Sequence, residues 1–180
     1  MNLPNRLTLA RVLLIPVFVI LMLLYEKHPY VNYAAAAVFI GASLTDLFDG
    51  KIARKYNLVT NFGKFMDPLA DKLLVISALI CLLYLRMIPV WAVLVICARE
   101  FIISGFRLVA AEQGVVLAAS MTAKVKTTFQ MIMTVSLILD FPWPFFRVLS
   151  MILIIISVIL TIVSLVEYLI KNRYVLNGEM

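Results

Sequence analysis

The sequence predicts an all-α integral membrane protein with six transmembrane helices and a short N-terminal interfacial helix. Of its 180 residues, 64% are hydrophobic and 14% are charged, and the mean hydropathy is +1.04. Ordinary soluble chains carry about 25% charged residues. A membrane-spanning helix needs about 20 apolar residues, and six apolar runs of that order cover residues 7–26, 31–50, 65–86, 88–111, 125–141 and 145–170. A single transmembrane domain, residues 1–180, accounts for the chain.

Polar residues, proline and glycine indicate where several of the predicted helices begin. Residues 1–11 alternate polar side chains with leucine, which is typical of a short interfacial helix before the first span. The first apolar run is long enough to span, so we expect no removable signal peptide. Pro68 is expected in the opening turn of the third helix, where its missing N–H costs little. Asn61 and Gly63 are expected in the loop before that helix.

The basic residues are distributed unequally between the two ends of the predicted spans. Lys27, Arg86 and Arg147 flank the short turns on one side, which leaves thirteen of the 16 Lys and Arg residues on the side of the termini. The positive-inside rule then places both termini in the cytoplasm. The net charge is +6, and its position at the ends of apolar runs favours anionic lipid headgroups and phosphorylated substrates over nucleic acid as partners. Cys81 and Cys97 lie inside apolar runs, so they are interpreted as packing residues.

Two pairs of aspartates form the most informative pattern. Asp46 and Asp49 are three residues apart, and Asp67 and Asp71 are four apart, so each pair shares one face if its segment is helical. Both pairs fall at the cytoplasmic ends of the second and third predicted helices. Carboxylates held this close repel each other unless a cation lies between them, and oxygen ligands favour Mg²⁺ or Mn²⁺. Two such ions about 3.5–4 Å apart suit a displacement at phosphorus.

Two other interpretations of the acidic cluster stay open. The aspartates can form structural ion pairs with Arg54, Lys64 or Lys72, although such pairing needs one or two carboxylates, not four. A small cation transporter would also hold carboxylates, but near the bilayer midplane on unwound helices, whereas these lie at one membrane face beside basic residues. Gly50 either ends the apolar part of the second helix or lets a ligand approach its backbone closely.

Three cations near the fourth and fifth helices are candidates for binding a substrate phosphate. Arg107 closes the fourth apolar run, Lys124 and Lys126 open the fifth, and the intervening loop, residues 112–123, is short. Because the lysines are two residues apart, a helix at residue 124 directs them to different faces. Binding of lipid headgroups is the alternative role for these cations.

The aspartate-containing stretch is similar to the signature of the CDP-alcohol phosphatidyltransferase family at every defined position. It reads Asp46-x-x-Asp49-Gly50-x-x-Ala53-Arg54, then eight residues, then Gly63-x-x-x-Asp67-x-x-x-Asp71. The resemblance implies six transmembrane helices, often in a homodimer, and an active site open to the cytoplasmic face. It also implies a reaction that depends on a divalent metal and moves the phosphatidyl group of CDP-diacylglycerol to an alcohol, with release of CMP.

The same resemblance implies roles for individual positions. Asp46, Asp49 and Asp67 are expected to be metal ligands, and Asp71 a ligand of the second metal and the general base. The expected nucleotide and diphosphate pocket comprises Gly50, Ala53, Arg54, Asn5, Thr8 and Gly63.

Further stretches resemble one bacterial branch of the family, whose acceptor is sn-glycerol 3-phosphate and whose products are phosphatidylglycerophosphate and CMP. They read Asn2-Leu3-Pro4-Asn5-x-Leu7-Thr8-x-x-Arg11, Asn57-x-x-Thr60-Asn61-x-Gly63-Lys64, Arg99-Glu100-Phe101-x-x-Ser104-x-x-Arg107 and Lys124-x-Lys126-Thr127. This branch implies the cytoplasmic (inner) membrane and adds Arg99 to the acceptor-binding cations. Inositol phosphate, serine and phosphatidylglycerol stay open as alternative acceptors, because the signature alone does not separate them.

Overall fold

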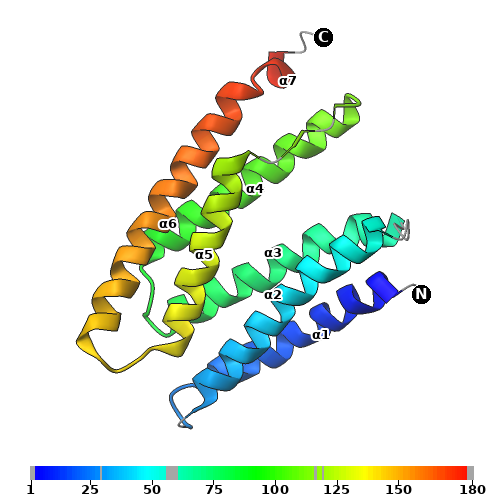
Figure 1. Ribbon diagram of the computed structural model, residues 1–180. Helices are drawn as coiled ribbons and strands as arrows, with labels where there is room; N and C mark the ends of the chain where they lie inside the picture. The colour runs from blue at the N-terminus through cyan, green and yellow to red at the C-terminus, as the bar shows by residue number, and fades with distance from the viewer. Residues whose placement is uncertain (1–2, 29, 56–60, 116, 119, 178–180) are drawn as a thin grey trace. The chain divides into compact units, whose positions relative to one another are not determined.

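The computed structural model describes residues 3–28, 30–55, 61–115, 117–118 and 120–177; the side chains of residues 3, 4, 6, 46–55, 61, 62, 64, 65, 176 and 177 lie outside this description. The described part is helical and contains no β-strand. Its elements are α1 (Leu3–Leu23), α2 (Val31–Lys55), α3 (Asn61–Tyr84), α4 (Val90–Glu112), α5 (Met121–Leu139), α6 (Pro144–Lys171) and the short α7 (Tyr174–Asn177) (Figure 1). The six predicted helices are therefore present, and α7 was not predicted.

The first of two compact units comprises residues 1–87 and 137–140. Within it α1 packs against both α2 and α3, and α2 packs against α3. Phe18 of α1 and Phe39 of α2 are fully buried, with ring centroids 5.7 Å apart. Beyond α1, the Tyr25 hydroxyl donates a hydrogen bond of 2.6 Å to Asp140 Oδ2. This contact ties the turn after α1 to the residue that follows α5.

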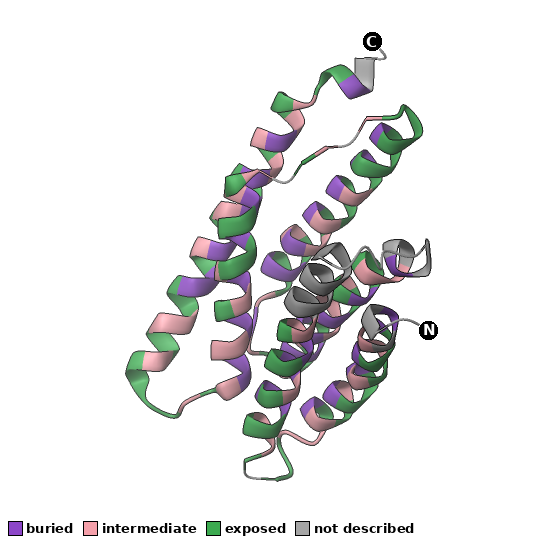
Figure 2. Cartoon of the chain, turned by 45° about the vertical axis from the view of Figure 1, so that its right-hand side comes forward, coloured by how far each residue is buried: buried purple, intermediate pink, exposed green. Residues whose placement is uncertain are grey.

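The second unit comprises residues 88–136 and 141–180, and within it α4 packs against α6. Its apolar core joins Ile103, Phe106 and Ala110 of α4 to Tyr168 of α6 and Val175 of α7. The Phe106 and Tyr168 rings meet edge to face with centroids 5.7 Å apart, an arrangement that aromatic pairs prefer. The helices of both units bury residues on one side and expose residues on another (Figure 2).

Local sequence explains where several helices of the second unit begin and end. Gly114 has φ +77° directly after the last turn of α4, and the N–H of Val115 bonds to the carbonyl of Ala110 at 2.8 Å, as in the glycine-terminated ends of many helices. Ser120 Oγ accepts a hydrogen bond from the backbone N–H of Ala123 at 3.2 Å, which caps the start of α5. Pro144 occupies the first turn of α6, a favoured position for proline.

The prediction of a separate interfacial helix at the N-terminus was wrong. α1 is continuous from Leu3 to Leu23. The polar residues that suggested a membrane-surface segment are instead buried within the unit: Asn5, Thr8 and Arg11 are 8%, 1% and 1% exposed. They recur every three residues, so they form one buried polar face of α1.

The predicted start of the third helix was also wrong. α3 begins at Asn61, so Asn61 and Gly63 belong to its first turn, and Pro68 lies inside the helix. A proline there removes the hydrogen bond to the carbonyl of residue 64, a loss that membrane helices tolerate when neighbouring groups satisfy the carbonyl. α2 continues past Gly50 to Lys55, beyond the apolar run that predicted it.

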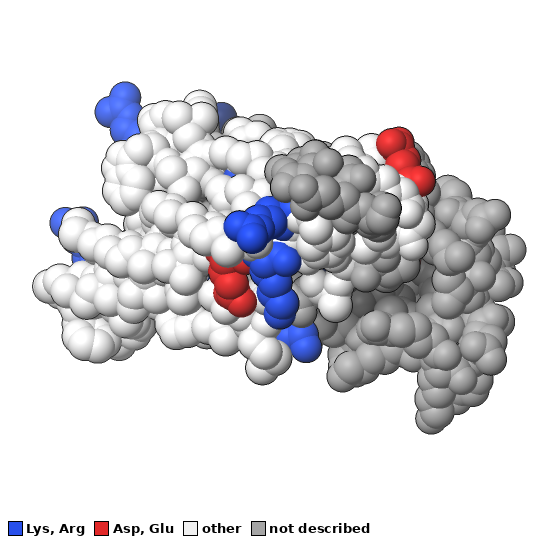
Figure 3. All heavy atoms as spheres, turned by 90° about the horizontal axis from the view of Figure 1, so that it is seen from above, with Lys and Arg blue, Asp and Glu red and all other residues white. Residues whose placement is uncertain are grey.

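One helix of the described part is long and apolar enough to cross a membrane by length and composition. This is α6, whose most apolar 18-residue stretch has a mean hydropathy of 3.0. Shorter apolar stretches lie in α1 and α2, at residues 7–23 and 31–45. On the face drawn in Figure 3, charged side chains form a few small groups among uncharged atoms. These features indicate membrane association, and the number of spans stays a prediction. Both cysteines are free, as predicted.

Candidate active site

The two aspartate pairs lie on helices of the same compact unit. Asp46 and Asp49 are three residues apart within α2, and Asp67 and Asp71 are four apart within α3, so the helical spacing on which their prediction rested is confirmed. α2 and α3 pack against each other. The side chains of Asp46 and Asp49 lie outside the described residues, as do those of Gly50, Ala53 and Arg54 from the predicted pocket.

Asp67 is anchored by α1. Its Oδ1 atom accepts a hydrogen bond of 2.6 Å from the hydroxyl of Thr8, which is 1% exposed. Hydrogen bonds to a carboxylate are stronger than those between neutral groups. Asp71 lies one turn further along α3 and is exposed. The unit therefore holds one aspartate fixed by a buried hydroxyl and a second on the same helix face.

Thr8 and Asn5 were predicted to contact the nucleotide. Both are buried on the face of α1 that includes Arg11, and Gly63 is buried in the first turn of α3. The hydroxyl of Thr8 contacts Asp67. This contact makes Thr8 a candidate for orienting Asp67, a predicted metal ligand.

The donor set of the aspartates fits a hard divalent cation. Carboxylate oxygens suit Mg²⁺ or Mn²⁺, and a hydrogen bond to a ligating carboxylate, such as that from Thr8, is the usual means of orienting it. Among the side chains that the structure describes, no group of three or more His, Cys, Asp or Glu residues gathers. Two members of the predicted set, Asp46 and Asp49, lie outside that description.

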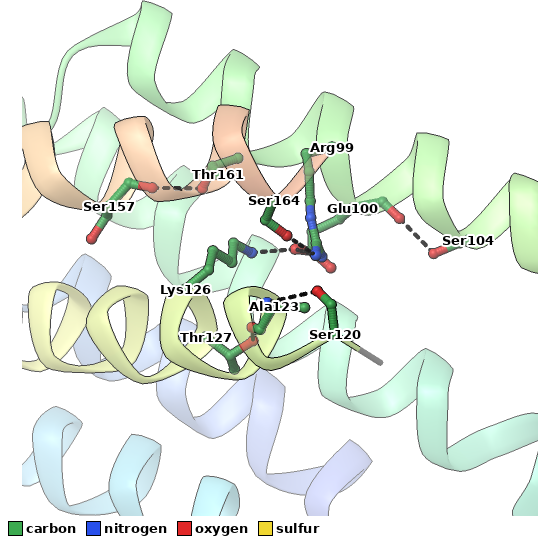
Figure 4. Close-up of polar contacts among 10 residues, drawn as sticks. All are labelled: Arg99, Glu100, Ser104, Ser120, Ala123, Lys126, Thr127, Ser157, Thr161 and Ser164. Carbon is green, nitrogen blue, oxygen red and sulfur yellow. Dashed lines mark hydrogen bonds and ion pairs between the residues drawn. The ribbon is translucent and has the colours of Figure 1, made fainter. Parts of the chain in front are cut away.

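The second unit contains a buried charged cluster, which we define as Arg99, Glu100, Lys126 and Ser164 (Figure 4). Glu100 Oε1 accepts hydrogen bonds from Lys126 Nζ and, at 3.1 Å, from Arg99 Nη1. Arg99 Nη2 donates to Ser164 Oγ at 2.8 Å. The cluster joins α4, α5 and α6 through polar contacts.

The cations that were predicted to bind the acceptor phosphate differ in how far they are buried. Lys126 is 1% exposed, whereas Lys124 is exposed, which confirms that the two lysines lie on different faces of α5. Arg99 is buried beside Lys126. Arg107 is exposed, and its Nε donates to the Tyr168 hydroxyl at 3.3 Å. The loop before α5 is shorter than predicted and covers residues 113–120, because Ser120 caps the helix.

Glu100 belongs to the stretch of residues 99–107 that resembles the bacterial branch, but no role was predicted for it. The available signal was an acidic residue inside an apolar run, which by default indicates a functional site. The contact with Lys126 joins residues 26 positions apart, and no local pattern indicates such a pairing. Ser164, 65 positions from Arg99, carries no sequence signal of its own.

The Thr8 contact gives a specific prediction. Thr8→Val removes the hydroxyl at nearly constant volume, so Asp67 loses its orienting hydrogen bond, and we expect activity or metal affinity to fall by about 10- to 100-fold. The measurement is the Mg²⁺ concentration that gives half-maximal activity. Thr8→Ser is the matched control, since it keeps the hydroxyl. An unchanged Mg²⁺ dependence in Thr8→Val, with an unchanged melting temperature, contradicts the orienting role.

Comparison with known proteins shows the family of the chain. The family model for CDP-alcohol phosphatidyltransferase matches residues 1–163. The chain belongs to this family, and it is an enzyme of the phosphatidyltransferase class. Enzymes of the family generally depend on divalent metal ions.

Similar curated proteins carry more specific names. The chain is 48% identical over 184 aligned positions, 95% of each chain, to the CDP-diacylglycerol–glycerol-3-phosphate 3-phosphatidyltransferase of Bacillus subtilis. It is 39% identical, over 96% of this chain and 95% of the relative, to the protein of the same name from Shigella flexneri. It is 38% identical to a probable phosphatidylglycerophosphate synthase of Mycobacterium tuberculosis, over 93% of this chain and 79% of the relative.

Proposed function

We propose that the protein transfers the phosphatidyl group of CDP-diacylglycerol to sn-glycerol 3-phosphate, giving phosphatidylglycerophosphate and CMP. The observation that carries the proposal is the 48% identity, across 95% of both chains, to a relative named for this reaction. The aspartate signature and the buried cations of the second unit supply matching chemistry. Membership of a transferase family favours this function over a cation transporter.

In the proposed reaction, the acceptor hydroxyl oxygen bonds to the phosphorus that carries diacylglycerol. The bond from this phosphorus to the bridging oxygen of the diphosphate breaks, and CMP leaves. Asp71 accepts the hydroxyl proton, because an exposed carboxylate one turn from Asp67 can receive a proton from an incoming hydroxyl and act as a general base. A divalent metal pair held by Asp46, Asp49, Asp67 and Asp71 would neutralise negative charge that develops on the diphosphate.

The phosphate of the acceptor requires positive groups besides the metal site. Lys126 and Arg99 are the buried candidates, and Arg107 is the exposed one, in contact with Tyr168. Lys124 is exposed on the other face of α5, so headgroup binding is its proposed role. Charge-assisted hydrogen bonds to a phosphate are stronger than neutral ones, which suits an acceptor that carries a dianion.

The membrane arrangement is part of the proposal. Six spans with both termini in the cytoplasm place the aspartates at the cytoplasmic face of the inner membrane. The unequal distribution of Lys and Arg supports this orientation. Assembly as a homodimer is proposed from the family resemblance alone.

The proposed function is tested by incubating the purified protein with CDP-diacylglycerol and a panel of acceptors. We expect phosphatidylglycerophosphate with glycerol 3-phosphate, and no product with inositol phosphate, serine or phosphatidylglycerol. Product is identified by mass, and CMP is measured in the same reaction. Omission of CDP-diacylglycerol is the control. Efficient transfer to another acceptor, in preference to glycerol 3-phosphate, contradicts the proposal and favours the alternative function within the family.

A further inference from the structure

Glu100 is an acidic partner that two buried cations share. The side chains of Lys126 and Arg99 are 2% and 8% exposed, and that of Glu100 is 18% exposed. Both cations contact the same oxygen, Glu100 Oε1. Figure 4 shows the three side chains converging from α4 and α5, with Ser164 on α6. Two cations therefore share one carboxylate oxygen.

A buried guanidinium group is costly unless its charge and its N–H donors are compensated. Arg99 has five N–H donors in a planar fork. Its Nη1 and Nη2 atoms bind Glu100 and Ser164, and its Nε is buried without a hydrogen-bond partner among the described residues. An anion bound beside this cation would satisfy both its charge and its buried Nε–H donor.

We infer that Glu100 is a positioning residue, which holds Arg99 and Lys126 side by side so that together they bind the phosphate of the acceptor. This inference rests on the proposed function, and it adds the group that arranges the cations. Lysine is a flexible point charge with several rotatable bonds, and α5 alone does not fix the direction of its ammonium group. The contact with Glu100 fixes that direction and keeps Lys126 next to a guanidinium group that would otherwise repel it.

The alternative is a purely structural role, in which the cluster only ties α4, α5 and α6 together. The two roles differ in kinetics. A structural tie affects stability and both substrates alike, whereas a positioning residue for the acceptor phosphate affects the KM for glycerol 3-phosphate alone. They also differ in how two substitutions combine. A positioning residue acts through Lys126, so the effects of substituting Glu100 and Lys126 on the KM are not additive.

The test uses Glu100→Gln, which removes the charge at nearly constant shape, and Glu100→Asp, which keeps it. In Glu100→Gln the KM for glycerol 3-phosphate is expected to rise about tenfold or more, the range of one charge-assisted hydrogen bond. The kcat and the KM for CDP-diacylglycerol are expected to stay near the wild-type values. Glu100→Asp is expected to recover part of the effect. Glu112→Gln, which changes an exposed residue at the end of the same helix, is the matched control.

A double-mutant cycle tests whether Glu100 acts through the lysine. If it does, Glu100→Gln adds little to the KM increase of Lys126→Met, because contacting residues are non-additive. Additive effects, an unchanged KM for glycerol 3-phosphate, or a parallel rise in both KM values overturns the inference. Melting temperatures identify variants that fail to fold, and Glu100→Asp then serves as the test variant. Failure of the wild-type protein to use glycerol 3-phosphate would instead contradict the proposed function, so the two failures are distinguishable.

Discussion

Asp46→Asn, Asp49→Asn and Asp67→Asn are each expected to abolish transfer while leaving the protein folded in detergent. Asparagine keeps the shape of aspartate but removes the charge that a divalent cation requires. The metal supplies several kcal/mol of transition-state stabilisation, so its loss is expected to lower kcat by about a thousandfold or more. The measurement is the rate of CMP release at saturating substrate, with folding followed by the melting temperature.

A binding readout makes this prediction independent of activity. A ligand that binds only the folded state raises the melting temperature, so Mg²⁺ or Mn²⁺ is expected to stabilise the wild-type protein and to have a smaller effect on the three variants. Asp140→Asn is the matched control: Asp140 is exposed, lies outside the candidate site, and bonds to Tyr25 through an oxygen that asparagine also offers. Full wild-type activity in excess chelator would rule out the metal-dependent mechanism.

The helices could be predicted from the sequence because apolar runs of about 20 residues leave few other structures in a membrane. The helix ends could not be predicted, because polar residues near them are buried in the packing of the helices. Thr8 and Arg11 suggested a surface segment, yet they are buried in α1. Pro68 suggested a helix start, yet α3 begins seven residues earlier, at Asn61.

The candidate site was predictable to a similar extent. Helical periodicity alone places each aspartate pair on one helix face, and it alone directs Lys124 and Lys126 to different faces. The partners of these residues could not be predicted. Thr8 meets Asp67 across 59 positions, and Glu100 meets Lys126 across 26. Such pairs depend on how helices pack, which periodicity within one helix does not determine.

Asp71→Asn is expected to lower kcat by about 10²- to 10⁴-fold, the usual contribution of a general base. The KM for CDP-diacylglycerol is expected to change little, because the diphosphate keeps its other proposed contacts. Asp71 lies one turn from Asp67 on α3 and is exposed. A position on the same face but nearer to the surface suits a residue that receives a proton from an incoming hydroxyl.

Asp71 is also a predicted metal ligand, so the experiment must separate the two roles. A variant that has only lost metal affinity regains its rate as the Mg²⁺ concentration rises, because excess metal refills the site by mass action. A variant that has lost its base does not, since no added metal replaces the missing proton acceptor. We therefore expect the kcat of Asp71→Asn to stay low at saturating Mg²⁺. Recovery to a near-normal kcat would assign proton transfer to a water molecule or to the acceptor's own phosphate.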